Sequence, residues 1–378
     1  MVDNSGKIVF STYINHKFSK RNTLKTGFNF HTLFYKLDLN STITNVPETF
    51  QNFVKENGYS SFSEFYIQSK YDITEKLSIN SGINTNYFAL NNDFSVDPRF
   101  SIKWKFIPKH SLSFGFGKHS QLEDLKIYLV NKSINGNLEY PNRDLSLSKA
   151  LHFVVGYDWQ ITDNIRLKIE PYFQYLYNIP GKPGSSYSLI NFTQDWTFRD
   201  SLANNSKGHN YGIDFTLERF LNDGYYFLVT TSIFKSIYGG DDGIWRSTKF
   251  NKGYVASLLF GKEFNLRNNK LLGLNGRFSF IGGDRISPVL MAESIQDQTV
   301  YYDETKAFEI QTPATKYLDL TLTYRINKAR HSTVWALQIK NVLGSKNYEG
   351  YAYYYKTGSI ENKGYLVILP VLSYKIEF

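Results

Sequence analysis

Long stretches of this sequence alternate strictly between apolar and polar residues, and this period of two constrains the fold more than any other feature. Between residues 318 and 326, the even positions are apolar or aromatic: Leu318, Leu320, Leu322, Tyr324 and Ile326. The odd positions between them are polar: Asp319, Thr321, Thr323 and Arg325. Because successive side chains of a β-strand point to opposite faces, this pattern predicts a strand with one apolar and one polar face.

The same template predicts about fifteen strands along the chain. They lie near residues 7–17, 23–37, 59–73, 77–88, 98–107, 110–120, 147–160, 164–178, 208–220, 224–237, 253–264, 271–281, 315–326, 333–343 and 364–378. Most are as long as the strands that cross a bilayer, about 9–11 residues.

The connections between these strands alternate in length. Short ones include residues 19–22, 161–164, 221–224 and 328–331. Long ones cover residues 38–58, 121–146, 179–207, 238–252, 282–314 and 344–363, and the connection at 89–97 is shorter than the others of its class. Outer-membrane barrels have short periplasmic turns and long extracellular loops. The predicted fold class is therefore all-β, a transmembrane antiparallel up-and-down β-barrel, with a soluble multi-sheet protein as the alternative.

An odd number of strands indicates an incomplete barrel. Bacterial single-chain barrels have an even number, so that both chain ends lie on the periplasmic side. By the alternation of turns and loops, the first strand here runs inward and its predecessor is missing. Residues 1–378 are thus expected to form a partial barrel domain whose N-terminal strands lie upstream.

Composition agrees with a barrel and excludes several other classes. The chain has 30 Phe and 29 Tyr, and aromatic residues suit both strands and membrane interfaces. No apolar run approaches the roughly 20 residues of a spanning helix, and no Cys is present for a disulfide or a thiolate site. The net charge of +9 is scattered without a basic block, so no nucleic-acid partner is expected. The residues after Met1 do not form a signal peptide, which suggests either a cytoplasmic protein or a start further upstream.

Four segments resemble TonB-dependent receptors, particularly those of Bacteroidetes-like bacteria. Residues 207–219 read KGHNYGIDFTLER and resemble a strand of that family, and the turn after them continues the match. Residues 97–101 (DPRFS) resemble a strand start, residues 341–351 the penultimate strand and its loop, and residues 370–378 (PVLSYKIEF) the terminal strand.

The resemblance implies energy-driven uptake of a scarce nutrient across the outer membrane of a Gram-negative bacterium. The nutrient would be a siderophore, a cofactor, an oligosaccharide or a peptide. Family members have roughly 22 strands around a plugged lumen. A plug domain and a TonB box are absent from this chain, so the TonB complex would act through a missing N-terminal region. Outer-membrane lipid and the barrel assembly machinery are the other expected partners, and no cofactor is expected.

Two other functions are alternatives to active uptake: a passive channel and an enzyme. A passive porin-like channel with about sixteen strands would be complete in itself and would conduct constitutively. An outer-membrane enzyme would need a nucleophile, a base and an orienting group, and no such set can be assembled here, so an enzyme is not expected.

The candidate functional residues fall into two groups. Tyrosines crowd two long connections and could contact substrate, although loop packing and the upper aromatic girdle are the favoured explanation: Tyr301, Tyr302, Tyr348, Tyr351, Tyr353 and Tyr354. A terminal apolar row resembles the C-terminal insertion signal of barrel proteins: Leu372, Tyr374, Ile376 and Phe378. No metal site is expected, since the seven His residues lack ligand spacing and the loop carboxylates lack the remaining ligands of a calcium loop.

Overall fold

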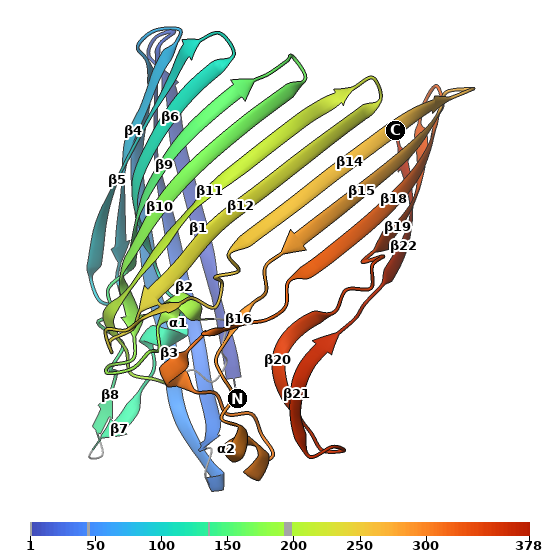
Figure 1. The fold of residues 1–378 in the computed structure, drawn as a ribbon. Helices are drawn as coiled ribbons and strands as arrows, with labels where there is room; N and C mark the ends of the chain where they lie inside the picture. The colour runs from blue at the N-terminus through green and yellow to red at the C-terminus, as the bar shows by residue number, and fades with distance from the viewer. Residues whose placement is uncertain (1, 44–45, 135–136, 193–198) are drawn as a thin grey trace.

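A single antiparallel sheet dominates the computed structural model, which describes residues 2–43, 46–134, 137–192 and 199–378. The sheet has 16 strands and curves into an open trough (Figure 1). All but one of them follow one another along a single path: β1 (Val2–Lys17), β2 (Asn22–Ile43), β3 (Val46–Asp72), β4 (Leu77–Phe88), β5 (Asp93–Ile107), β6 (His110–Gln121), β9 (Ser148–Gln160), β10 (Ile165–Gly181), β11 (Ala203–Asn222), β12 (Tyr225–Gly239), β14 (Tyr254–Leu266), β15 (Lys270–Ile281), β18 (Thr315–Asn327), β19 (Ser332–Lys340) and β22 (Leu369–Glu377).

The long connections carry the remaining elements. These are α1 (Leu125–Tyr128), β7 (Lys132–Ile134), β8 (Asn137–Glu139), η1 (Leu189–Asn191), β13 (Trp245–Ser247), β16 (Arg285–Ile286), α2 (Met291–Gln296), η2 (Glu304–Lys306), β17 (Ile310–Gln311), β20 (Asn347–Tyr354) and β21 (Ser359–Tyr365). None of the helices in the described ranges is long and apolar enough to cross a membrane.

Each strand predicted from the alternation corresponds to one strand of the main path, and the sixteenth strand, β13, pairs with β12 inside a loop. The predicted fold class is therefore confirmed, and so is an open wall: β1 and β22 each have a single neighbour in the sheet. Because every step along the path is antiparallel and the path has an odd number of strands, β1 and β22 run in the same direction.

The prediction of a long irregular connection at residues 38–58 was wrong. There β2 and β3 continue as a hairpin that projects from the sheet in Figure 1. The apolar residues of this extension, Leu37, Leu39 and Val54, are buried against Leu129 of another loop. Outside the bilayer the apolar face turns inward, so a search for outward apolar residues ends too early.

The last predicted strand, 364–378, also began too early. Residues up to Tyr365 belong to β21, which forms a separate hairpin with β20, and the wall strand begins at Leu369. The penultimate strand ends at Lys340 rather than at 343, because residues after it form a turn in which Asn341 has φ 53°.

The two faces of the wall differ as the alternation predicts. Register aligns one outward row across four neighbouring strands: Leu274, Leu322, Leu337 and Leu372. Their side chains are 42–70% exposed in the isolated chain, which suits contact with lipid. The inward face carries ion pairs such as Arg277–Asp319 at 2.7 Å.

Aromatic side chains mark both ends of the outward face. At the turn end, the ring centroids of Trp335 and Tyr374 lie 4.4 Å apart. At the loop end, His209 stacks between Tyr175 and Trp245, at centroid distances of 5.1 and 4.8 Å. Two such belts are the pattern expected at the two interfaces of a bilayer.

The connections at the two ends of the sheet differ in kind (Figure 1). At one end the turns are tight, as between β11 and β12, where Asp223 and Gly224 have φ values of 53° and 74°. Consecutive positive φ values are those of a type I′ hairpin turn. At the other end the long connections fold over the mouth of the trough and form a cap, defined here as the described residues between the wall strands at that end.

Candidate substrate site at the loop end of the barrel

Three neighbouring strands line the trough near the cap, and their inward side chains form polar rows across the strands. Each pair of side chains in register is called a rung. Across β10 and β11, Glu170 pairs in register with Asp214, Tyr172 with Gly212, and Gln174 with Asn210. The rungs follow one another because every second residue of a strand faces the same side. The result is a carboxylate rung and a carboxamide rung with a tyrosine between them.

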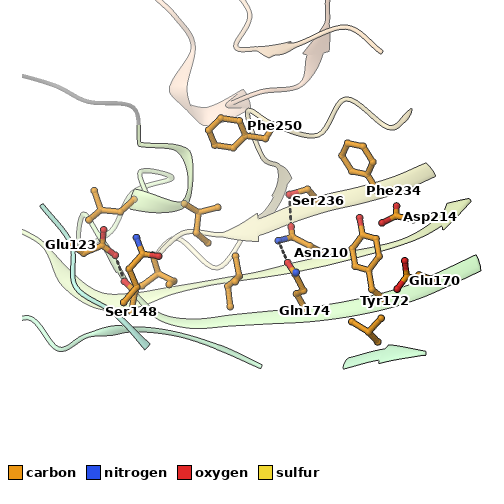
Figure 2. A pocket seen from close by; sticks show the side chains of 16 residues that line it. Glu123, Ser148, Glu170, Tyr172, Gln174, Asn210, Asp214, Phe234, Ser236 and Phe250 are labelled. Atoms are coloured by element: carbon orange, nitrogen blue, oxygen red, sulfur yellow. Dashed lines mark hydrogen bonds between the residues drawn. The ribbon is translucent and has the colours of Figure 1, made fainter. Parts of the chain in front are cut away.

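The rungs form one side of a cavity of about 700 Å³ (Figure 2). Phe234 of β12 and Phe250 of the following loop face this space, together with Leu189 of η1. Its lining contains carboxylates, carboxamides, hydroxyls and apolar groups, but no lysine or arginine among the described residues. Such a mixture of apolar surface with a few convergent polar groups is typical of a small-molecule site.

A chain of hydrogen bonds ties the wall to the loop above it. Asn210 Nδ2 donates to Gln174 Oε1 at 3.1 Å, and Ser236 Oγ donates to Asn210 Oδ1 at 2.6 Å. Thr248 Oγ1 then donates to Ser236 Oγ at 2.7 Å, and Thr248 is 1% exposed. The loop between β12 and β14 is thus fixed directly over the carboxamide rung.

The cap has a hydrophobic core of its own. Ile127, Tyr128 and Val130 around α1 are fully buried against Phe88 and Leu202, which come from other connections and strand ends. Burial raises the pKa of the Tyr128 hydroxyl. These segments lie far apart in the sequence, so the cap is held by tertiary packing rather than by local structure.

Glu123 lies at the edge of this core and lines the cavity. Its carboxylate accepts a hydrogen bond from the Ser148 hydroxyl. Burial raises the pKa of Glu123, and the Ser148 hydrogen bond opposes part of that rise. A carboxyl group with a raised pKa is partly neutral at mildly acidic pH.

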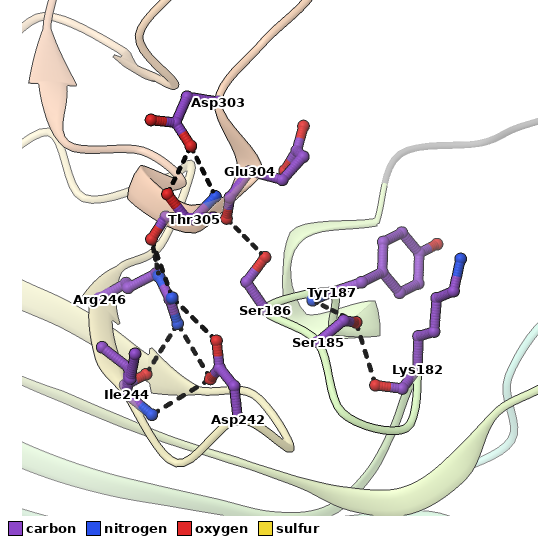
Figure 3. Close-up of polar contacts among 10 residues, drawn as sticks. All are labelled: Lys182, Ser185, Ser186, Tyr187, Asp242, Ile244, Arg246, Asp303, Glu304 and Thr305. Atoms are coloured by element: carbon purple, nitrogen blue, oxygen red, sulfur yellow. Dashed lines mark hydrogen bonds and ion pairs between the residues drawn. The ribbon is translucent and has the colours of Figure 1, made fainter.

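A buried arginine joins two connections of the cap, and a serine hydroxyl ties a third connection to them (Figure 3). The Arg246 guanidinium pairs with Asp242 at 2.8 Å and donates to the Thr305 carbonyl oxygen at 2.9 Å from Nη2. The Ser186 hydroxyl donates to the neighbouring Glu304 carbonyl oxygen at 2.8 Å. Arg246 also holds the pKa of Asp242 below its usual range. This clamp, Arg246 with Asp242, Ser186 and Thr305, joins the loops that begin after β10, β12 and β15.

The predicted substrate-contact tyrosines lie in the cap, away from the cavity. Tyr348, Tyr351, Tyr353 and Tyr354 belong to β20. Tyr301 and Tyr302 lie between α2 and η2. The Tyr302 hydroxyl lies beside Gly350 of β20, because a Cβ atom added to that glycine would be 3.1 Å from it. The structure therefore brings the two tyrosine groups together, but none of the six lines the cavity.

The terminal apolar row lies on the outward face of β22. Leu372 pairs with Leu337 and Tyr374 with Trp335 of β19, while no strand of the described residues lies along the other edge of β22. Leu372 is 70% exposed and Phe378 is fully exposed.

The residues that line the cavity were not predicted as a site. Asn210 and Asp214 lie in the segment that resembles the family strand, at even positions that alternate with Tyr211, Ile213 and Phe215. That signal indicates the lumen but not the position along it. The loops that close the cavity have no periodicity, so no pattern could pair Phe250 with Tyr172. Among the described residues, no group of three or more His, Asp or Glu side chains is arranged to hold a metal.

The fold defines a class before any family is considered: an outer-membrane type of barrel wall, outward apolar and inward polar, with short turns at one end and a folded cap at the other. The family model described as "TonB dependent receptor-like, beta-barrel" matches residues 3–342. The chain belongs to this family, whose members are transporters and receptors of the Gram-negative outer membrane that interact with TonB and bind small ligands.

Solved structures agree on the fold. The ferric yersiniabactin uptake receptor FyuA from Yersinia pestis is similar, with a TM-score of 0.66 at 10% identity, over 100% of this chain and 55% of that one. The ferric-catecholate import receptor Fiu from E. coli K12 gives 0.65 at 13% identity, over 99% of this chain and 54% of that one. The outer membrane transporter YddB from Escherichia coli gives 0.61 at 14% identity, over 99% and 54%. The chain spans about half the length of these receptors, and no curated protein matches it.

Proposed function

We propose that this chain forms part of the wall of an outer-membrane receptor that takes up a scarce nutrient with energy supplied through the TonB complex. The receptor would lie in the outer membrane of a Gram-negative bacterium, with the cap outside the cell and the tight turns in the periplasm. The cap-end cavity would receive the nutrient first.

The observation that carries this proposal is the match of the receptor-barrel family over residues 3–342. The cap adds support, because a folded core and a clamp lie at the loop end of the trough. A passive channel has no need of such a cap.

Uptake dependence on energy tests the proposal. Cells that carry the complete receptor should accumulate its nutrient only with an intact TonB and a proton gradient. The purified complete protein should not conduct ions constitutively in a planar bilayer. A steady open conductance, with uptake unaffected by loss of TonB, would favour the porin instead.

We further propose that strands outside these 378 residues complete the wall. β1 and β22 expose unpaired backbone groups at their outer edges, and each unsatisfied group in lipid costs several kcal/mol. The two edge strands run in the same direction, so joining them directly would require a parallel pair, which is not how bacterial single-chain barrels close. Sequencing the messenger RNA across Met1 tests this. An in-frame stop just before Met1, with a closed barrel formed by these residues alone, would contradict it.

Assembly of the wall is the role we propose for the terminal row Leu372, Tyr374, Ile376 and Phe378, which would be read by the barrel assembly machinery. Deleting Phe378 from the complete receptor should lower its amount in the outer membrane without lowering its synthesis. Leu337→Ala on the neighbouring strand serves as the matched control, since it changes the same outward face but not the terminus. Equal membrane amounts of wild type and deletion would refute this role.

The tyrosines of β20, with Tyr301 and Tyr302, remain candidates for a first contact with the nutrient at the cell surface. Tyr354 and Tyr301 are well exposed, and both lie on the cap.

A further inference from the structure

The cavity beneath the cap has a chemistry that narrows the choice of nutrient. We infer that it receives a neutral, hydroxyl-rich ligand of the oligosaccharide class, bound on Tyr172 between the carboxylate and carboxamide rungs. This inference rests on the proposed uptake function and adds the substrate class to it.

An aromatic ring at the centre of the site is held in place by a glycine. A Cβ atom on Gly212 would lie 2.9 Å from the Tyr172 hydroxyl, so the tyrosine tip lies over the bare backbone of β11. The same added Cβ atom on Gly212 would lie 2.7 Å from the Cβ atom of Phe234, so Phe234 lies beside Tyr172. Figure 2 shows both rings at one end of the cavity, with Phe250 on the loop opposite. The C–H face of a sugar ring is apolar and packs on such aromatic surfaces.

Hydrogen-bonding groups flank the tyrosine on both sides along the strands. Glu170 and Asp214 form the rung on one side, and Gln174 and Asn210 form the rung on the other. Within the described residues, the Gln174 amide NH₂ donates to no group, and the Asp214 carboxylate accepts only the Ser232 hydroxyl, at 2.6 Å. Carboxylates accept from hydroxyls, whereas carboxamides both donate and accept, so together they match the paired hydroxyls of a sugar.

The charge of the cavity argues against an anionic ligand. Glu170 is paired with Lys168 at 2.6 Å, whereas neither Glu123 nor Asp214 forms an ion pair with any described residue. With no lysine or arginine in the described lining, two carboxylates are left without a cation. Like charges brought together at a binding site cost several kcal/mol, so a ferric siderophore with net negative charge is disfavoured here.

A glycan array tests the inference directly. The complete receptor, labelled and purified in detergent, is applied to an array of neutral oligosaccharides, and affinity for the best probe is then measured by calorimetry. Tyr172→Ala should weaken binding by about tenfold or more, equivalent to about 1.4 kcal/mol. Tyr172→Phe should retain most of it, because the ring remains. Asp214→Asn should also weaken binding. Phe173→Leu, one residue along but on the outward face, is the matched control and should bind as wild type does.

The outcomes separate this inference from the proposed function. TonB-dependent uptake of a ferric tris-catecholate by the receptor, with no neutral glycan retained on the array, would overturn the substrate class and leave active uptake standing. Glycan binding unaffected by both Tyr172→Ala and Asp214→Asn would place the sugar elsewhere and overturn the site. Glycan binding that follows the expected order would support it, whether or not uptake requires TonB.

Discussion

The wall and the cap of this protein are built with opposite arrangements of apolar residues. In the wall, Leu322 and its row point outward and are about half exposed in the isolated chain. In the cap, Leu129 and Tyr128 are fully buried among side chains from other connections. The difference follows from the solvent, because lipid accepts apolar groups and water does not. One chain therefore contains a region whose apolar side chains face outward and a region whose apolar side chains are buried. The boundary between the two regions lies where the strands leave the bilayer.

The largest difference in stability between the cap and the wall should appear when a leucine is replaced by alanine. Leu129→Ala removes methyl groups from a packed core and leaves a cavity, at a cost of about 2–5 kcal/mol to the cap. Leu322→Ala should cost less, since lipid or detergent chains fill the space that the side chain leaves. Hydrogen–deuterium exchange of residues 122–131 in the complete receptor measures the first, and thermal unfolding of the barrel measures the second. Equal losses would mean that the wall row is packed against protein rather than lipid.

A charge placed on the two faces of one strand should sharpen the assignment of the wall. Leu320→Arg puts a cation in the lipid and should destabilise the barrel by roughly 2–4 kcal/mol near the midplane. Thr321→Arg points into the polar trough and should be tolerated. The measurement is the urea midpoint of unfolding in lipid vesicles. Similar midpoints for the two variants would show that the faces are wrongly assigned.

Loss of the clamp should loosen the cap and leave the wall intact. Arg246→Ala removes the hydrogen bonds that the charged guanidinium donates to Asp242 and to the Thr305 carbonyl oxygen. A hydrogen bond to a charged group contributes roughly 1.5–3 kcal/mol to stability. The loops after β10, β12 and β15 should then be cleaved faster by an added protease, while the heat stability of the barrel stays unchanged. Lys182→Ala, whose partner is Asp200 at the surface, is the control and should have little effect. A fall in barrel stability with Arg246→Ala would mean that cap and wall unfold together.

The two regions also differ in how far the sequence predicts them. Alternation located every wall strand, because a period of two is fixed by the backbone and by one solvent on each side. It failed at Leu39 and Val54, where the apolar face turns inward and is buried against Leu129 beside α1. The cavity could not be predicted, because Phe250 and Tyr172 meet only when an irregular loop folds over the wall. The tyrosines of β20 stood out by composition alone, which says nothing of where a hairpin points.

The smallest effect expected is a pH dependence within the cap, in which two carboxylates act with opposite signs. Burial raises the pKa of Glu123, so its neutral form suits the folded cap. Its stabilising contribution is complete below the ordinary value of 4.5 and is lost as the pH rises through the raised pKa. The pKa of Asp242 is lowered by Arg246, so its contribution is present above the ordinary value of 3.8 and is lost as the pH falls through the lowered one.

Hydrogen exchange in residues 122–131, corrected for the intrinsic rate, should therefore quicken as the pH rises above 4.5. Glu123→Gln should abolish that trend and protect the segment at neutral pH, because the amide oxygen can still accept from Ser148. Asp242→Asn should leave the trend in place and act only at the acidic end. An unchanged pH trend in Glu123→Gln would show that another group controls the opening of the cap.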